Sequence, residues 1–163
     1  MIPRALIAIA AVVASIPGAA ASQSLWDHPL VLDLVHGRPA AVDRDHDLPT
    51  LRGRILAEHR DATWAPGMER ALKLRLVSDA VLTEPRTQHE VRCGATLCEV
   101  AMVTSLGSDD EGIRKAAFSS FARLADRDLG LDHQTSAYLT VDETPRMQSI
   151  LAFFARSGAP EPD

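Results

Sequence analysis

The segment that decides the fold is Val91-Arg92-Cys93-Gly94-Ala95-Thr96-Leu97-Cys98-Glu99-Val100, which holds the only two cysteines of the 163-residue chain. Apolar and polar residues alternate through it and on to Thr104, a pattern typical of paired β-strands. A four-residue connection that contains Gly94 separates the cysteines, so they fall opposite each other in a hairpin. Their α-carbons then lie near the separation that a disulfide bridges. We therefore predict a hairpin closed by a Cys93–Cys98 disulfide.

A structural disulfide suits an exported protein, and the N-terminus has the layout of a secretory signal peptide. Arg4 precedes an apolar run over residues 5–16, and a Pro-Gly pair and small residues follow over 17–22. The apolar run is well short of the roughly 20 residues that span a bilayer. A lipoprotein would need a cysteine at the cleavage point, and the first cysteine of this chain is Cys93. We expect cleavage near Ala21 and a periplasmic or secreted mature protein with no stable membrane insertion.

The chain is acidic and, without the signal, has the size of one domain. Its net charge of −5 becomes −6 when the single positive charge of Arg4 is removed. Binding to nucleic acid favours a basic patch, so we expect no nucleic-acid partner. We divide the chain into a signal peptide (1–21), a linker or extended arm with prolines and interspersed charges (22–49), one α+β domain (50–157) and a disordered tail (158–163).

Helical periodicity occurs on both sides of the hairpin. Before the hairpin, two stripes are made by Leu51, Ile55, Leu56 and His59 and by Met68, Leu72 and Leu76. Pro66 suits the first turn of the second of these helices, where its missing amide is not needed. After the hairpin, Ser108-Asp109-Asp110-Glu111 matches a capping box. The helix that it opens is expected to place Phe121 and Leu124 on one face and to stop at Gly130.

The C-terminal residues leave two interpretations open. Tyr138 to Val141 is a short run of β-prone residues. After it, Met147, Ile150, Leu151 and Phe154 fit a helical stripe starting at Thr144-Pro145, whereas Ile150–Phe154 also suits a buried strand. We favour the strand, because it completes a second hairpin. The expected fold is α+β, with two helices on one face of a four-stranded antiparallel sheet in a ferredoxin-like αββαββ order.

One resemblance rests on Asp61, Trp64-Ala65, Met68-Glu69 and Leu72, followed by the cysteine segment 91–100. These residues resemble a group of uncharacterised exported proteobacterial proteins in which a Trp-Ala, Met-Glu helix precedes a Cys-x4-Cys hairpin. The resemblance covers roughly residues 60–154. It implies a periplasmic setting and no particular chemistry, so it assigns no functional residues.

The cysteine pair has a catalytic interpretation beside the structural one. A positive charge such as Arg92 lowers the pKa of a nearby thiol and favours exchange, and His89 lies close in the sequence. Thioredoxin-type catalysts, however, place two residues between their cysteines at a helix start, whereas this pair has four within a hairpin. The spacing favours a structural disulfide. A small envelope enzyme or thiol-disulfide oxidoreductase using Cys93 and Cys98 is the alternative function.

Metal binding and cofactors are not indicated. The carboxylates of Asp43-Arg44-Asp45-His46-Asp47 alternate as in a calcium loop, but Leu48 and Arg54 stand where that loop needs glycine and glutamate. Histidines 28, 36, 46 and 59 do not follow a recognisable ligand spacing. No glycine-flanked serine or phosphate-binding loop is present. We expect neither a metal nor a cofactor.

The remaining candidates are residues for contact with another protein. Trp64 is either an exposed anchor or a core residue at a helix start. The basic side chains of Arg70, Lys73 and Arg75 share its helix, and Arg92 lies in the hairpin. Because no residues meet the needs of acid-base, metal or covalent chemistry, the sequence favours a non-enzymatic interaction module with an envelope protein as partner. An inhibitor or immunity-type protein is one specific version.

Overall fold

The computed structural model describes residues 24–37, 41–42, 47–79, 87–105, 118–121, 123–124, 127–141 and 145–159. The predicted signal peptide, the calcium-like segment up to His46, the capping box at Ser108 and the last four residues lie outside these ranges. None of the described helices combines the length and the apolar character that crossing a bilayer requires.

The elements follow in the order η1 (Leu25–Asp27), α1 (Pro29–Val35), β1 (Ala41–Val42), α2 (Leu48–Ala57), α3 (Ala65–Ser78), β2 (Thr87–Cys93), β3 (Leu97–Ser105), η2 (Arg127–Leu129), β4 (Leu131–Val141) and β5 (Met147–Arg156). Residues 118–121 and 123 are also helical. The strands form one antiparallel sheet in the order β1-β4-β5-β3-β2. The α+β class and the antiparallel sheet are therefore confirmed, with the two-residue β1 as an addition to the four expected strands.

The ambiguous C-terminal segment is a strand, as the hairpin argument favoured. β5 lies between β3 and β4, and all of Ile150–Phe154 is buried. A central strand that is covered on both faces carries a continuous apolar run instead of an alternating one. This is why the helical stripe through Met147, Ile150, Leu151 and Phe154 was an equally good match to the sequence.

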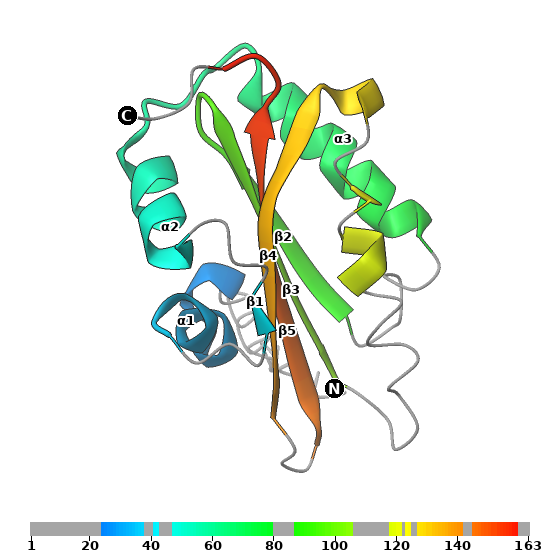
Figure 1. Cartoon of the computed structure of the whole chain (residues 1–163). Helices are drawn as coiled ribbons and strands as arrows, with labels where there is room; N and C mark the ends of the chain where they lie inside the picture. Colours follow the sequence, from blue (N-terminus) through cyan, green and yellow to red (C-terminus); the bar gives the residue numbers. More distant parts are fainter. Residues whose placement is uncertain are drawn as a thin grey trace, which may run out of the picture.

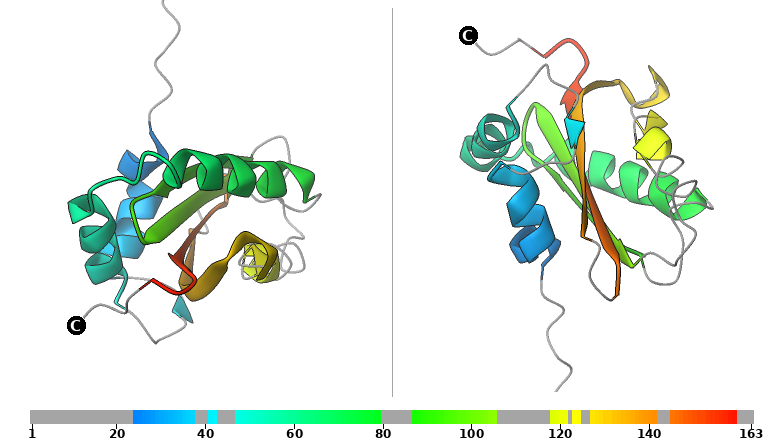
Figure 2. Two further views of the ribbon diagram at one scale, coloured as in Figure 1. Left: turned by 90° about the horizontal axis from the view of Figure 1, so that it is seen from above. Right: turned by 60° about the horizontal axis from the view of Figure 1, so that its bottom comes forward.

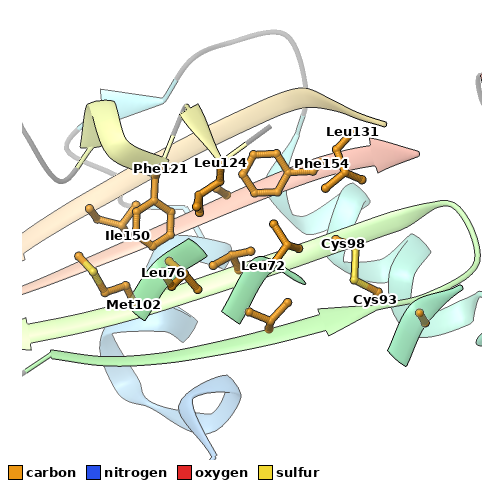
Figure 3. Close-up of a cluster of buried hydrophobic side chains, with 14 residues drawn as sticks. Leu72, Leu76, Cys93, Cys98, Met102, Phe121, Leu124, Leu131, Ile150 and Phe154 are labelled. Atoms are coloured by element: carbon orange, nitrogen blue, oxygen red, sulfur yellow. A yellow bond between two sulfur atoms is a disulfide. The ribbon is translucent and has the colours of Figure 1, made fainter. Parts of the chain in front are cut away.

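Helices cover both faces of the sheet, because α1 and α2 add to the expected pair. The two helical segments of the expected order, α3 and residues 118–121, pack on the same face. Figure 1 shows α1 and α2 on one side of the sheet and α3 on the other, and the views in Figure 2 agree. On the α3 face, Leu72, Leu76, Phe121 and Leu124 pack on residues of β2, β3 and β5 (Figure 3). On the opposite face, Leu34, Leu51 and other residues of η1, α1 and α2 pack on Leu97, Ala101, Val103, Ala137, Leu151 and Phe153.

The predicted extended arm over residues 22–49 is also wrong, because this region contains η1, α1, β1 and the start of α2. Pro29 stands in the first turn of α1, where it favours a helix start. The His28 imidazole accepts a hydrogen bond from the Leu30 amide and caps the same helix. Val31, Leu34 and Val35 are buried against the sheet. The short apolar patches of the supposed arm are the buried face of a helix.

A polar row crosses the α3 face of the sheet at the end far from the disulfide. Thr87 pairs with Thr104, Thr104 with Gln148, and Gln148 with Thr140 on four adjacent strands. The hydroxyls of Thr87 and Thr104 are 2.9 Å apart. Gln148 is fully buried, and neither its amide nitrogen nor its amide oxygen has a hydrogen-bond partner among the residues that the structure describes. Such a group lowers stability, because its hydration is lost without replacement.

Replacing Gln148 with methionine, which is apolar and of similar length, should raise the free energy of unfolding by about 1–3 kcal/mol. Urea denaturation measures the change. The matched control is Gln88→Met on β2, where the glutamine is exposed and the same substitution should leave stability nearly unchanged. A less stable Gln148→Met protein would show that the buried amide has partners that stabilise the fold.

Candidate functional site

The predicted disulfide is present at the end of the β2–β3 hairpin. Cys93 and Cys98 are register partners with α-carbons 4.0 Å apart, and they are joined by the disulfide. Their exposed fractions are 2% and 0%, since both pack in the cluster beneath α3 (Figure 3). Thiol exchange requires a thiolate to reach one of the two sulfur atoms. The folded protein therefore shields this disulfide from a second thiol.

The loop between the cysteines is held by the carboxylate of Glu58, which follows α2. Glu58 Oε2 accepts hydrogen bonds from the amides of Ala95, at 2.7 Å, and Thr96, at 2.9 Å, and Oε1 accepts from the Thr96 hydroxyl. Burial alone would raise the pKa of Glu58, but the hydrogen bonds from Thr96 and Ala95 outweigh it, and the pKa is lowered. A Cβ at Gly94 would lie 3.2 Å from the Cβ of Glu58 and closer still to Oε2. Glycine is therefore needed where this carboxylate enters the loop.

Two further acidic residues attach the same loop to α3. The Cys93 amide donates to Glu69 Oε1 at 3.0 Å, and the Asp61 amide donates to the Gly94 carbonyl at 3.4 Å. Asp61 Oδ1 also accepts from the hydroxyl and the amide of Thr63 and from the Trp64 amide just before α3. These hydrogen bonds, led by that of the Thr63 hydroxyl, lower the pKa of Asp61 to about 2. We call Glu58, Asp61, Glu69 and the loop 93–98 the disulfide-loop clamp.

A second polar cluster lies on the opposite face of the sheet. Glu99 is fully buried and forms ion pairs with Arg92 and, at 3.9 Å, with Arg52. The Trp26 ring stacks over both guanidinium groups, at 4.4 Å from Arg92 and 5.8 Å from Arg52. Burial raises the pKa of Glu99, although the two arginines oppose the shift. The cluster binds η1 to the sheet.

Glu90 extends this cluster toward the N-terminal residues. Its carboxylate accepts hydrogen bonds from the Ser24 hydroxyl, at 2.9 Å, and from the Leu25 amide, at 2.7 Å. Neither glutamate is predicted from the sequence as a structural residue. A signal for this cluster is present in the sequence. Glu90, Arg92 and Glu99 fall on the same face of the predicted hairpin, so the three charged side chains are expected to lie close together.

The outer flank of α3 is hollowed and exposed. Pro66, Glu69, Arg70, Lys73, Leu74 and Val77 line a hollow of about 460 Å3, which we call the α3 groove. Leu74 is 61% exposed and Val77 is 51% exposed, which is high for large aliphatic side chains. Arg70 and Lys73 are exposed and form no ion pair with the described part of the chain. The groove combines apolar contact area with two available positive charges.

The structure separates the five residues predicted for interaction. Arg70 and Lys73 lie together in the α3 groove. Trp64 is half-buried against the core, and the Arg156 guanidinium lies 5.1 Å from its ring centre. Arg75 is half-buried on α3 and is not part of the groove. Arg92 lies in the buried cluster with Glu99 on the other face.

The histidines considered as metal ligands are not gathered in the described residues. His28 caps α1, His36 follows the end of that helix, and His59 lies between α2 and α3. No three histidine, cysteine or acidic side chains of the described ranges are placed to hold one metal ion. Comparisons of the chain with protein families, with curated proteins and with solved structures find no match.

The low pKa of Asp61 predicts a pH dependence of stability. A carboxyl whose pKa is lower in the folded than in the unfolded protein stabilises the fold above its ordinary pKa, here 3.8, and this contribution is lost as the pH falls toward about 2. Asp61→Asn keeps the acceptor oxygen but has no charge. Its urea midpoint should lie below that of the wild type at pH 7, and the difference should disappear near pH 2.

The matched control for this experiment is Asp132→Asn, which removes an exposed carboxyl from β4 without touching the clamp. It should follow the wild type across the same pH range. A constant difference between Asp61→Asn and the wild type from pH 7 to pH 2 would rule out a charge-dependent role of Asp61.

Proposed function

We propose that the protein is an exported, non-enzymatic interaction module that binds an envelope protein through the α3 groove. The observation that carries this proposal is the groove itself, where Leu74 and Val77 are more than half exposed beside Arg70 and Lys73. In a chain with a net charge of −5, five arginines of the described part form ion pairs with carboxylates, whereas Arg70 and Lys73 form none with the described residues. Exposed apolar side chains next to available charges favour contact with a complementary surface.

An inhibitor or immunity-type protein that shields an envelope enzyme is a specific version of this function. Export is supported by the disulfide, which forms and persists in oxidising compartments, and by the signal-like N-terminal sequence. Trp64 and Arg92 are not part of the proposed surface, since both contact other residues of the fold.

We further propose that the resemblance to exported proteobacterial proteins reflects the disulfide-loop clamp. Asp61 and Glu69 both bind the loop that the cysteines close, and Leu72 packs beneath it. These shared residues would then maintain a structure and leave the binding surface free to vary. The ferredoxin-like order is supported by the sheet order β4-β5-β3-β2. A ferredoxin-like sheet has this order when its first strand is moved to the end of the chain.

The oxidoreductase alternative makes an opposite prediction about the disulfide. Because both cysteines are buried, dithiothreitol should reduce the disulfide far more slowly in the native protein than in the protein unfolded in guanidinium. A thiol-reactive probe then labels the cysteines that have been reduced. Mass spectrometry counts the labelled thiols over time. Equal labelling rates in the two conditions would contradict a shielded structural disulfide and favour the redox function.

The interaction surface is tested by site-specific photo-crosslinking in cells of the source organism. A benzoylphenylalanine at position 74 should crosslink to one envelope protein, identified by mass spectrometry. The crosslink should be lost when Arg70→Glu and Lys73→Glu are added, because both charges in the groove are reversed. The matched control is the same crosslinker at position 56, since Leu56 is 63% exposed on α2 outside the groove. Identical products from both positions, or none from position 74, would contradict the proposal.

A further inference from the structure

We propose that the partner contributes an extended acidic segment, which adds to β2 as a further antiparallel strand with its acidic side chains in the α3 groove. This inference rests on the proposed function and names the chemistry of the partner. Strand addition gives affinity through main-chain hydrogen bonds and specificity through the side chains on one face.

β2 is an edge strand whose outward backbone groups can be identified. Among the strands that the structure describes, it pairs only with β3. The Gly94 amide bonds the Leu97 carbonyl, so residues 94 and 97 are a hydrogen-bonded pair and Cys93 and Cys98 are not. The short 4.0 Å distance between the α-carbons of the cysteines agrees with this assignment. The Cys93 amide therefore points away from β3, and it donates to Glu69 instead.

Successive backbone amides of a strand point to opposite sides, so every second residue of β2 has its amide on the same side. The amides of Val91, His89 and Thr87 point the same way as that of Cys93. None of the hydrogen bonds between described backbone groups outside the ladder uses the amide of Val91 or His89. A second extended chain can therefore pair with β2 between Thr87 and Val91, while Glu69 closes the edge at Cys93.

The α3 groove lies along this same edge. Glu69 lines the groove and binds the Cys93 amide at one end. Burial lowers the pKa of the His89 imidazole, and the nearby positive charge of Lys73, which lines the groove, lowers it further. Two groove residues, Glu69 and Lys73, thus lie beside β2 at Cys93 and His89, so α3 runs antiparallel to the strand and its groove flank adjoins this edge.

The side chains of the added strand are placed by the same register. Val91 and Cys93, whose amides point outward, have their side chains in the cluster beneath α3. Directly opposed residues of an antiparallel pair have side chains on the same face. The partner residues that hydrogen-bond to β2 therefore face α3, where Arg70 and Lys73 favour carboxylates and Leu74 and Val77 favour aliphatic carbons.

A second copy of this chain fits the edge less well. Two β2 strands paired about a two-fold axis would bring the Arg70 and Lys73 side chains of both copies onto one face of a continuous sheet. Like charges in this arrangement repel. An anionic bilayer satisfies the charges but cannot supply a row of backbone hydrogen bonds. An acidic extended segment satisfies both the charges and the strand edge.

The test uses a fluorescein-labelled decapeptide of alternating glutamate and valine, with the mature protein and fluorescence anisotropy. Two backbone N-methylated forms of the peptide show which set of amides, those of glutamate or those of valine, hydrogen-bonds to β2. Methylation of the glutamate amides should abolish binding, because those amides face β2 in an antiparallel pair, whereas methylation of the valine amides should leave binding within about twofold. Loss with the valine set alone would show strand addition in the parallel direction. Equal effects of the two sets would overturn strand addition.

Protein variants test the charge. Lys73→Glu should weaken binding of the decapeptide by about threefold to tenfold, as reversal of a charge at an interface rim does. Arg123→Glu is the matched control, because it changes the net charge equally at an exposed site on another helical segment. Hydrogen exchange of the His89 and Val91 amides should slow when the peptide is added. Unchanged exchange at both amides would overturn the proposed pairing.

The alternatives give distinct results. A dimer in sedimentation that excludes the peptide would assign the edge to a second copy, and binding to phosphatidylglycerol vesicles with no binding of the decapeptide would assign the groove to a membrane. Either result overturns the inference. If position 74 crosslinks to a protein while the decapeptide and its methylated forms do not bind, strand addition fails and the proposed function stands.

Discussion

The clamp on the disulfide loop is the constraint on which the remaining structure depends. The disulfide joins cysteines only five residues apart in the sequence, so by itself it removes little conformational entropy from the unfolded chain. Its effect comes from the carboxylates that bind the closed loop. Glu58 joins it to the end of α2, and Asp61 and Glu69 join it to the start of α3. One rigid loop therefore sets the position of two helices that lie on opposite faces of the sheet, and a slip of the β2–β3 register would break all of these contacts.

Coverage of the sheet on both faces determines which surfaces remain for binding. With η1, α1 and α2 on one face and α3, Phe121 and Leu124 on the other, the described sheet offers no open face. Available backbone groups are then confined to the edges. The edge at β2 is long and is flanked by the α3 groove, whereas the opposite edge is partly paired by β1. The edge position of β2 is thus a consequence of how the core is covered.

The sequence was most informative where the structure depends on neighbouring residues. Cys93, Gly94 and Cys98 lie within one turn, and Leu72 and Leu76 repeat on one helix, so local pattern predicts both the hairpin and α3. The helix α1 was missed because Pro29 has two meanings: it can extend a linker or start a helix, and the choice depends on whether Val31 and Leu34 have a sheet face to cover. Glu58 was missed for a similar reason. Its partners lie nearly forty residues away at Ala95 and Thr96, and no local pattern records such a contact.

Burial distinguishes the charges that maintain the fold from those available to a partner. Glu99 sits among Arg92, Arg52 and Trp26, and an ionised carboxylate is tolerated in such a place only because arginines accompany it. In the sequence, Arg92 looked as promising for interaction as Lys73. In the structure, the charge of Arg92 is paired with Glu99, whereas Lys73 is exposed in the α3 groove beside a strand edge. A basic residue on a predicted element is therefore evidence for binding only when folding leaves its charge without an internal partner, and this condition selects Arg70 and Lys73 from the four basic candidates.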